Sequence, residues 1–290
     1  MGAHSEDKMI RLGVWNIRYN KEHQKEKFDK LSEKVDIAIF IEADEQQYPL
    51  FKGLEKECHL ANSKHGIRAW VNPKSGITLK VVSDQIQFDP QKTNLAVPYI
   101  VSKEGAAPFC LVAVWTNTTE LEKKVKYEYL MSNIIQTMQT AKDQIESMPL
   151  LIVGDTNLLS KSSCENENEA VQERDESIKN LVKELIGKNN PANLNLLDIT
   201  DNSEEIMELE ENKSVKSPRS TLFHPGKKDH PGKWFCCDLA IASESMERRI
   251  IKDKNGNKDM KIGNYKDWHT IALDDGSGSD HLPLFINISE

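Results

Sequence analysis

Several features that would narrow the function are absent from this chain of 290 residues. No apolar stretch approaches the roughly 18 residues that a transmembrane helix needs, so no membrane contact is predicted. The first eight residues are polar and lack the apolar core of a secretory signal. We therefore predict a disordered N-terminal tail over residues 1–8 and a cytoplasmic location. No internal repeat is present.

Cysteine is scarce, and its five positions follow no repeated spacing: Cys58, Cys110, Cys164, Cys236 and Cys237. An odd number without a pattern predicts reduced thiols rather than a disulfide framework, and it gives no zinc motif. Three of the five lie within apolar runs, as small core residues do.

A basic excess is also missing, because the formal net charge is -8. Proteins that bind nucleic acid usually carry a basic surface, so the charge at first argues against such a partner. Residues 160–176 contain six acids and two bases, and residues 201–211 contain six acids and no base. These two segments account for -10, which leaves +2 for the rest of the chain. We predict acidic loop segments near residues 160–176 and 201–216, through which a protein partner can bind.

Short β-branched runs recur along the whole chain, each followed by a polar residue or a turn signal, and they predict strands. The runs are Ile10–Trp15, Ile37–Ile41, Ile77–Val82, Phe109–Trp115, Leu150–Val153, Phe235–Ala242 and Leu284–Ile288. Apolar residues at helical spacing predict amphipathic helices over about 121–145 and 178–187. No flexible linker separates two cores, so residues 9–290 are predicted to form one α/β sandwich with mixed sheets.

Polar residues stand where several predicted strands end: Asn16, Glu42, Asp155, Asn157, Asp280 and His281. Strand ends converge at one edge of a sheet, where loops can build a site. Carboxylate and amide oxygens suit Mg²⁺, for which Mn²⁺ can substitute. Hydrolysis of a phosphate ester needs such a metal, a group that orients water and donors for the transition state. Taken singly, Glu42 is equally well read as a solvated strand end and Asp280-His281 as a capped loop, and Gly154-Asp155-Thr156-Asn157 is better read as an ordinary turn.

The order of these residues is more specific than any one of them. They occur as Trp15-Asn16, Ile41-Glu42, Gly154-Asp155-Thr156-Asn157, a lone Asp238 within an apolar run, and Ser279-Asp280-His281-Leu282-Pro283. This set resembles the endonuclease/exonuclease/phosphatase superfamily, which includes exonuclease III type nucleases and DNase I, over nearly the whole chain. The resemblance implies a four-layer α/β sandwich, two mixed sheets packed face to face and flanked by helices, with Mg²⁺-dependent phosphodiesterase activity. The segments Leu111–Trp115, Ser220–Phe223 and Tyr265–Trp268 further resemble a bacterial nuclease-like branch.

The resemblance also implies a role for each motif residue. Asn16 and Glu42 would bind the metal, with Asp280 as a further carboxylate nearby. Asp155 would orient or deprotonate the attacking water, and Asn157 would hold a phosphate oxygen. His281 would contact the scissile phosphate, and Asp238 would pair with His281 and favour its cationic form. For Asp238 the alternative is a satisfied core carboxylate.

The residues that would contact the substrate are less clearly indicated by the sequence. Trp115 stands where the nucleases commonly have His or Tyr against the phosphate, and Asn117 can supply a polar contact in its place. His224 lies in a basic cluster with Lys227, Lys228 and Lys233, which is read equally well as a solvated turn. Trp234 and Trp268 can stack on a base, although packed aromatics are more common.

Three functions remain in competition on the sequence alone. The leading one is a nuclease that hydrolyses DNA, or less favourably RNA, by in-line attack of a metal-oriented water. A phosphatase or phosphodiesterase for small or lipid phosphate esters would suit the acidic surface better. A non-catalytic binding module is disfavoured, because it would have no reason to keep the whole set of polar residues.

Overall fold

The structure is a computed structural model of the chain. It describes residues 9–17, 24–44, 65–82, 94–116, 148–156, 194–197, 199, 205–209, 212–216, 222–224, 233–235, 237–263, 268 and 281–290. The predicted tail, the acidic segment 160–176 and the predicted helices 121–145 and 178–187 all lie outside the described residues.

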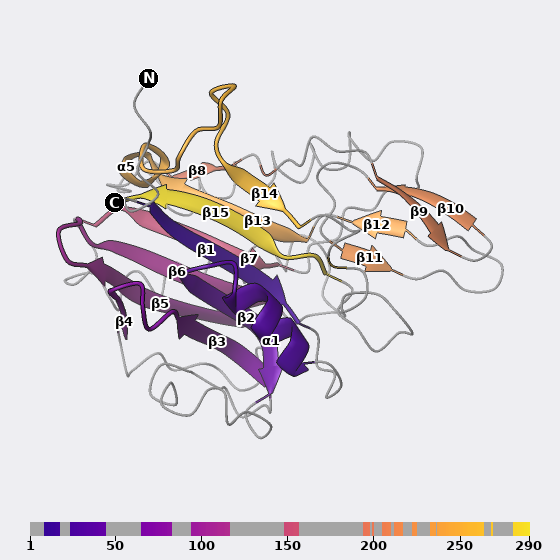
Figure 1. The fold of residues 1–290 in the computed structure, drawn as a ribbon, viewed down its shortest axis with the longest axis horizontal. Coiled ribbons are helices and arrows are strands. Elements are labelled where there is room, and N and C mark those ends of the chain that lie inside the picture. The colour runs from indigo at the N-terminus through magenta and orange to yellow at the C-terminus, as the bar shows by residue number, and fades with distance from the viewer. Residues whose placement is uncertain are drawn as a thin grey trace.

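Two mixed β-sheets pack face to face (Figure 1). The five-stranded sheet has the order β14-β15-β1-β2-β3, formed by Met260–Ile262, Leu284–Ser289, Met9–Asn16, Ile37–Asp44 and His65–Val71. The six-stranded sheet has the order β4-β5-β6-β7-β13-β8, formed by Ile77–Val81, Asn94–Lys103, Phe109–Thr116, Leu150–Asp155, Asp238–Ser243 and Leu194–Leu196. The predicted sandwich of two mixed sheets is confirmed.

Each sheet contains one described parallel pair of strands. The polar residues that follow the two strands of a pair lie at the same edge of the sheet. β1 runs parallel to β2, and β6 runs parallel to β7, whereas the other described pairs are antiparallel. Strands that run parallel end at the same edge of a sheet. The carboxyl ends of β1 and β2 therefore lie together in one sheet, and those of β6 and β7 lie together in the other.

The core fills the space between the sheets. Alternate residues of the strands point inward, among them Val14 and Ile39 from one sheet and Leu111 and Val153 from the other, and all four are fully buried. Side chains alternate between the two faces of a strand, so the same alternation brings Asn16 and Asp155 to the inner face at the strand ends.

Helix α1 (Gln24–Ser32) covers the outer face of the five-stranded sheet (Figure 1). Phe28 stacks on Phe40 with ring centroids 5.4 Å apart and meets Trp70 edge-on at 5.7 Å. A Cβ on Gly13 would lie 2.8 Å from the side chain of Leu31, so the glycine lets the helix approach β1 closely. The sequence did not predict this helix, because only Phe28 and Leu31 give it an apolar stripe.

The run Phe235–Ala242, predicted as one strand, is divided in the structure. β12 (Lys233–Phe235) ends at the first residue of the run, and β13 (Asp238–Ser243) begins only at Asp238. Asp238 was expected within a strand, but it is the first residue of β13. As the first residue of β13, Asp238 lies at the edge where the other polar residues lie, because β13 runs antiparallel to β7 and Asp238 pairs with Asp155.

The second acidic segment contains regular structure rather than loop alone. β9 (Glu205–Leu209) and β10 (Asn212–Lys216) form an antiparallel hairpin, and β11 (Leu222–His224) pairs with β12 in a second one. The register of β9 and β10 pairs positions of opposite charge, Glu208 with Lys213 and Glu205 with Lys216. Opposite charges at paired positions favour a hairpin over a solvated loop.

Helix α5 (Glu244–Glu247) follows β13 directly and is capped by Ser243, whose hydroxyl accepts from the Met246 N–H at 3.3 Å. Within the described ranges, no helix has the length and apolar character that crossing a membrane requires.

Candidate functional site

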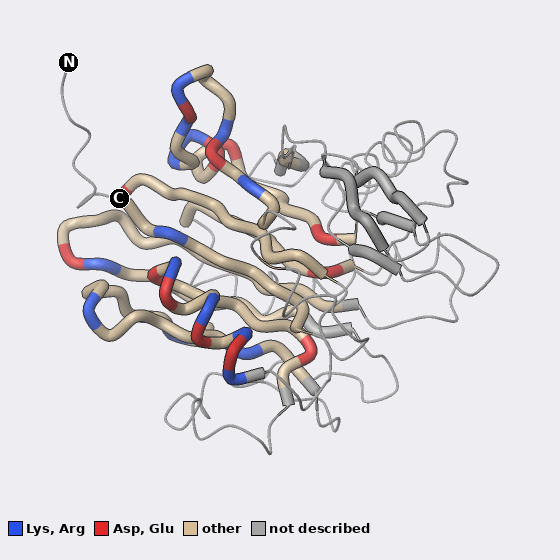
Figure 2. The backbone as a smooth tube through the Cα atoms, turned by 45° about the vertical axis from the view of Figure 1, so that its right-hand side comes forward, with Lys and Arg blue, Asp and Glu red and all other residues tan. Residues whose placement is uncertain are grey.

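Polar side chains from both sheets meet at the edge where the parallel strands end. The six-stranded sheet contributes a row of paired positions, Trp115 on β6, Asp155 on β7 and Asp238 on β13. The five-stranded sheet contributes Asn16 and Glu42. Figure 2 shows acidic positions gathered at this end of the strands, whereas the middle of the strands is mostly uncharged.

The amide of Asn16 bridges two carboxylates on different strands. Its Nδ2 atom donates to Oε1 of Glu42 at 3.0 Å and to Oδ2 of Asp155 at 2.8 Å. Because carboxylates only accept hydrogen bonds, the amide must present its N–H groups to both of them, which turns its Oδ1 atom to the other side. The bond to Asp155 joins the five-stranded sheet to the six-stranded sheet.

Glu42 reaches Asn16 because β2 contains a bulge at this point. The register with β3 shifts between Phe40 and Ala43, so one extra residue of β2 is accommodated. Glu42 has a φ of 58°, which side chains other than glycine seldom adopt. Without the bulge, Glu42 would share the outer face of the sheet with Phe40. The bulge instead aims the carboxylate at Asn16, and such strained positions cluster at ligand-binding sites.

Asp155 is fixed by its neighbours on β7. Gly154 has a φ of 144°, and a Cβ there would lie 2.0 Å from the backbone oxygen of Val114 on β6. Only glycine permits this approach. On the other side, the N–H and Oγ1 of Thr156 both donate to the carbonyl of Cys237, at 3.1 and 2.7 Å. The fully buried Asp155 carboxylate therefore has little freedom to move.

His281 lies between two carboxylates. Its Nδ1 atom is 3.1 Å from Oδ2 of Asp238, a hydrogen bond, and its Nε2 atom is 3.7 Å from Oδ2 of Asp155, an ion-pair distance. All three side chains are buried. The imidazole is therefore oriented by Asp238, with Nε2 toward Asp155.

Two sets of side chains at this edge can hold a metal ion. Among the described residues, one ligand atom from each of Asp155, Asp238 and His281 lies within 4.8 Å of the others, so this buried group could hold a metal ion. Asn16 and Glu42 form the second set, with an amide and a carboxylate 3.0 Å apart. Only the second set is made of oxygen donors alone, the ligands that suit Mg²⁺.

Trp115 stands beside Asp155 in the register of β6 and β7. It is buried, and within the described part of the chain its indole N–H has no hydrogen-bond acceptor. A buried donor without an acceptor costs free energy, and such groups in native proteins often mark a place where a ligand or a water binds.

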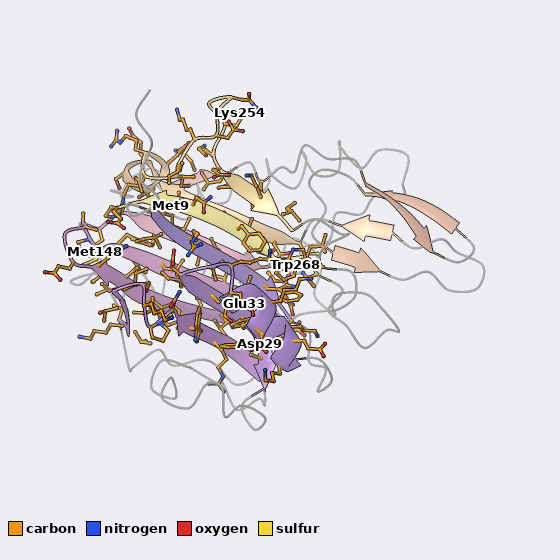
Figure 3. The ribbon with its side chains drawn as sticks, viewed as in Figure 1. Met9, Asp29, Glu33, Met148, Lys254 and Trp268 are labelled. Atoms are coloured by element: carbon orange, nitrogen blue, oxygen red, sulfur yellow. The ribbon has the colours of Figure 1, made fainter. Side chains whose placement is uncertain are left out.

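The other predicted site residues lie outside the described residues, are described only in part, or lie away from this edge. Asn117, Asn157 and Asp280 lie outside the described residues. His224 ends β11, where it pairs with Lys233, and only its backbone is described. Trp268 is buried on the outer face of the five-stranded sheet, where it packs edge-on against Trp15 with ring centroids 5.1 Å apart (Figure 3). This placement favours the alternative reading of Trp268, a packed aromatic, over a ring that stacks on a base.

Two contributors were missed by sequence reasoning. Thr156 and Trp15 stood within the sequence motifs without a role of their own. The indole Nε1 of Trp15 donates to the backbone carbonyl of His281 at 2.8 Å, across 266 positions of sequence. A contact between residues so far apart in sequence gives no local sequence pattern. The position of Trp15 directly before the predicted site residue Asn16 was the only indication of a role.

The sequence matches no protein-family profile and no curated protein, whereas several solved structures match over almost their full length. Truncated Caenorhabditis elegans TDP2 has a TM-score of 0.56 at 10% identity and covers 97% of this chain and 98% of its own. D. rerio TDP2 complexed with single strand DNA product has a TM-score of 0.54 at 11% identity, covering 97% and 99%. The human Nocturnin catalytic domain with bound sulfate anion has a TM-score of 0.52 at 15% identity, covering 97% and 94%. The chain therefore has the DNase I-like fold of these structures.

Proposed function

We propose that this chain is a metal-dependent phosphodiesterase of the endonuclease/exonuclease/phosphatase superfamily, and that its substrate is nucleic acid, DNA in preference to RNA. One observation carries the proposal. Five polar side chains form a continuous chain of contacts across the sandwich edge: Glu42, Asn16, Asp155, His281 and Asp238. A packed core has no need of such a chain, because burying charged groups is costly.

In this proposal each member of the chain has a role in an in-line displacement. A water oxygen attacks phosphorus opposite the leaving ester oxygen, so that one P–O bond forms as the other breaks. Asp155 accepts the proton of the attacking water, because its carboxylate is held at a fixed place by Asn16 at 2.8 Å. His281 donates a proton from Nε2 to the leaving oxygen, while Asp238 holds Nδ1.

Asn16 and Glu42 would hold Mg²⁺, or Mn²⁺ in its place, with Asp280 as an additional carboxylate. Asn16 would bind the ion through Oδ1, since its Nδ2 faces the two carboxylates, and Glu42 would bind it through a carboxylate that a strained backbone conformation aims at the site. A bound divalent cation would neutralise charge on the phosphoryl oxygens.

Substrate contacts would come from the six-stranded sheet side. The buried indole N–H of Trp115 would donate to a non-bridging phosphoryl oxygen, beside Asp155. Unlike His or Tyr, tryptophan can only donate here. Asn117, Asn157 and His224 would add further contacts. A nucleic-acid substrate is favoured because a structure of the same fold holds a single strand DNA product and another holds a sulfate anion.

A hydrolysis panel tests the proposal. The purified chain is incubated with Mg²⁺ or Mn²⁺ and single-stranded DNA, double-stranded DNA, abasic duplex, RNA, bis-p-nitrophenyl phosphate, and inositol and lipid phosphates. Asp155→Asn and His281→Gln are measured beside Asp29→Asn, which makes the same carboxylate-to-amide change on exposed helix α1.

Each outcome of the panel has a defined reading. Metal-dependent cleavage of nucleic acid that is lost in Asp155→Asn and His281→Gln, and kept in Asp29→Asn, supports the nuclease. Cleavage of small or lipid esters alone moves the activity to the phosphatase class. An absence of hydrolysis with either metal, in a folded protein, leaves the binding module as the function of the chain.

A further inference from the structure

Trp15 lies on the outer face of the five-stranded sheet, behind the site. It precedes Asn16 on β1, so its side chain points to the opposite face from that of Asn16. The ring is fully buried, yet its Nε1 atom donates to the carbonyl of His281 at 2.8 Å. A side chain outside the sandwich core thus holds the backbone of a residue that acts inside the site.

The Trp15–His281 hydrogen bond lies just beyond the point where the backbone pairing of β1 with β15 ends. The ladder between β1 and β15 ends at the pair Val14 and Leu284. Pro283, the next residue toward the site, has no N–H and cannot extend the ladder. Its carbonyl accepts from Gly263 at 2.7 Å instead. Beyond Pro283, the hydrogen bond from the Trp15 indole links His281 to β1.

Trp15 is itself held by packing. Trp268 meets it edge-on with an angle of 79° between the rings, a favourable geometry for an aromatic pair. Trp268 in turn has the Lys30 ammonium 4.8 Å above its ring centroid, and a Cβ on Gly263 would lie only 2.9 Å from its ring. Because both rings are buried, the indole N–H of Trp15 has a fixed direction.

We propose that Trp15 is a positioning residue for His281: its indole N–H fixes the backbone from which the imidazole reaches Asp238 and Asp155. The inference rests on the proposed function for its kinetic consequence, but its structural consequence does not depend on activity. His281 is attached to the five-stranded sheet by this bond, whereas its imidazole bonds to the six-stranded sheet. If the first attachment is lost, Nε2 no longer has a fixed position relative to Asp155.

The test variant is Trp15→Phe, which keeps an aromatic ring and removes the N–H. The matched control is Trp70→Phe, the same change on the outer face of β3, where the ring packs against Phe28. We expect Trp15→Phe to lower kcat about tenfold at nearly unchanged KM, the loss expected of one positioning hydrogen bond. Trp70→Phe should keep the wild-type kcat.

A second measurement is independent of catalysis. In protein labelled with ¹⁵N-histidine, the ring signals of His281 are assigned by their loss in His281→Gln. Trp15→Phe should shift or broaden the His281 Nδ1–H signal, because the hydrogen bond to Asp238 is disturbed, and Trp70→Phe should leave this signal in place. If Trp15→Phe does not fold, Trp268→Phe replaces it, since that change keeps the indole bond but loosens the ring that directs it.

The outcomes separate the two proposals. Unchanged His281 signals together with unchanged kcat in a folded Trp15→Phe protein would overturn the positioning role. Wild-type protein without hydrolysis of any ester would refute the proposed function, and the His281 signals would still decide whether Trp15 orients the imidazole.

Discussion

Nδ1 of His281 lies 3.1 Å from Oδ2 of Asp238, although the two residues belong to different sheets. Asp238 begins β13 in the six-stranded sheet, and His281 stands three residues before β15 in the five-stranded sheet. Together with the Asn16–Asp155 bond, this contact joins the two sheets at the same edge. The position of the imidazole therefore depends on the spacing between the sheets.

Replacing Asp238 by Asn should lower kcat by about 10²- to 10⁴-fold, the usual contribution of a positioned acid or base. An amide can turn an N–H toward Nδ1, which would favour the imidazole tautomer with its proton on Nε2 and would remove the charge that favours the imidazolium. Steady-state kinetics measures the effect, with Asp29→Asn as the control. A wild-type kcat in folded Asp238→Asn would show that this carboxylate only satisfies the core.

The Glu42→Gln change should weaken Mg²⁺ binding. In the wild-type protein, Mg²⁺ at about 100 times its Kd would stabilise the fold by roughly 2.7 kcal/mol, because only the folded state assembles the site. Thermal unfolding with and without Mg²⁺ measures this gain as a rise in Tm, which Glu42→Gln should reduce or abolish. Glu33→Gln, an exposed change just after α1, should keep it. An equal rise in all three proteins would place the ion elsewhere.

Gly154→Ala should destabilise the protein more than Gly76→Ala. Both glycines have positive φ values, so alanine is strained at either position by about 1–3 kcal/mol. At Gly76 a Cβ meets nothing within 4 Å, whereas at Gly154 it would lie 2.0 Å from the Val114 oxygen and would force β6 and β7 apart. Guanidinium unfolding compares the two midpoints. Equal midpoints would mean that the strands separate there at little cost.

Burial raises the pKa of the Cys110 thiol to about 12, from 9.0 in water. Between these two values the folded state keeps a proton that the unfolded state loses. The contribution of Cys110 to stability is therefore complete below pH 9 and declines as the pH rises toward 12. Unfolding measured from pH 8 to 11 should show a shallower decline in Cys110→Ala than in the wild type.

The same burial predicts the reactivity of Cys110, since the thiolate is the reactive form. At pH 8.5, iodoacetamide followed by peptide mapping should leave Cys110 unmodified in the native protein and modify it after unfolding. Rapid modification of Cys110 without unfolding would contradict the buried position on β6.

Salt should distinguish a nucleic-acid substrate from a small ester. Contacts to several phosphates release counterions, so KM for DNA should rise by about 10³-fold or more between 50 and 200 mM salt if six phosphates are bound. The response of bis-p-nitrophenyl phosphate should be far weaker. If the two substrates respond alike, the site recognises a single phosphate group rather than a polyanion.

The strands that the sequence predicted well include those with uninterrupted apolar runs, such as Ile37–Ile41 of β2 and Phe109–Trp115 of β6. β3 and β5 escaped prediction because Gly66 and Arg68 interrupt the first and Pro98 the second. Pro98 is tolerated within a sheet of six strands, where it pairs with Val112. Proline is disfavoured in a strand that is paired on both sides, so β5 could be recognised only from its neighbours in the sheet.

The residues of the candidate site were predictable to the extent that they stand at the ends of apolar runs. Asn16 and Asp155 follow from this pattern together with the motif order, and the structure brings them to 2.8 Å. The turn of Glu42 toward Asn16 was not predictable, because alternation along β2 assigns it to the other face and only a bulge corrects this. Equally, no local pattern shows that Trp15 bonds to His281.

The pairing of β1 with β15 has a consequence for the order in which the protein can mature during synthesis. β1 leaves the ribosome long before β15, one of its two neighbours in the sheet, which is made only when residues 284–289 are complete. Asn16 and His281 then come to the same edge from opposite ends of the sequence. A nascent chain that stops before residue 281 would contain the residues of all six strands of the six-stranded sheet but would lack the imidazole that pairs with Asp238.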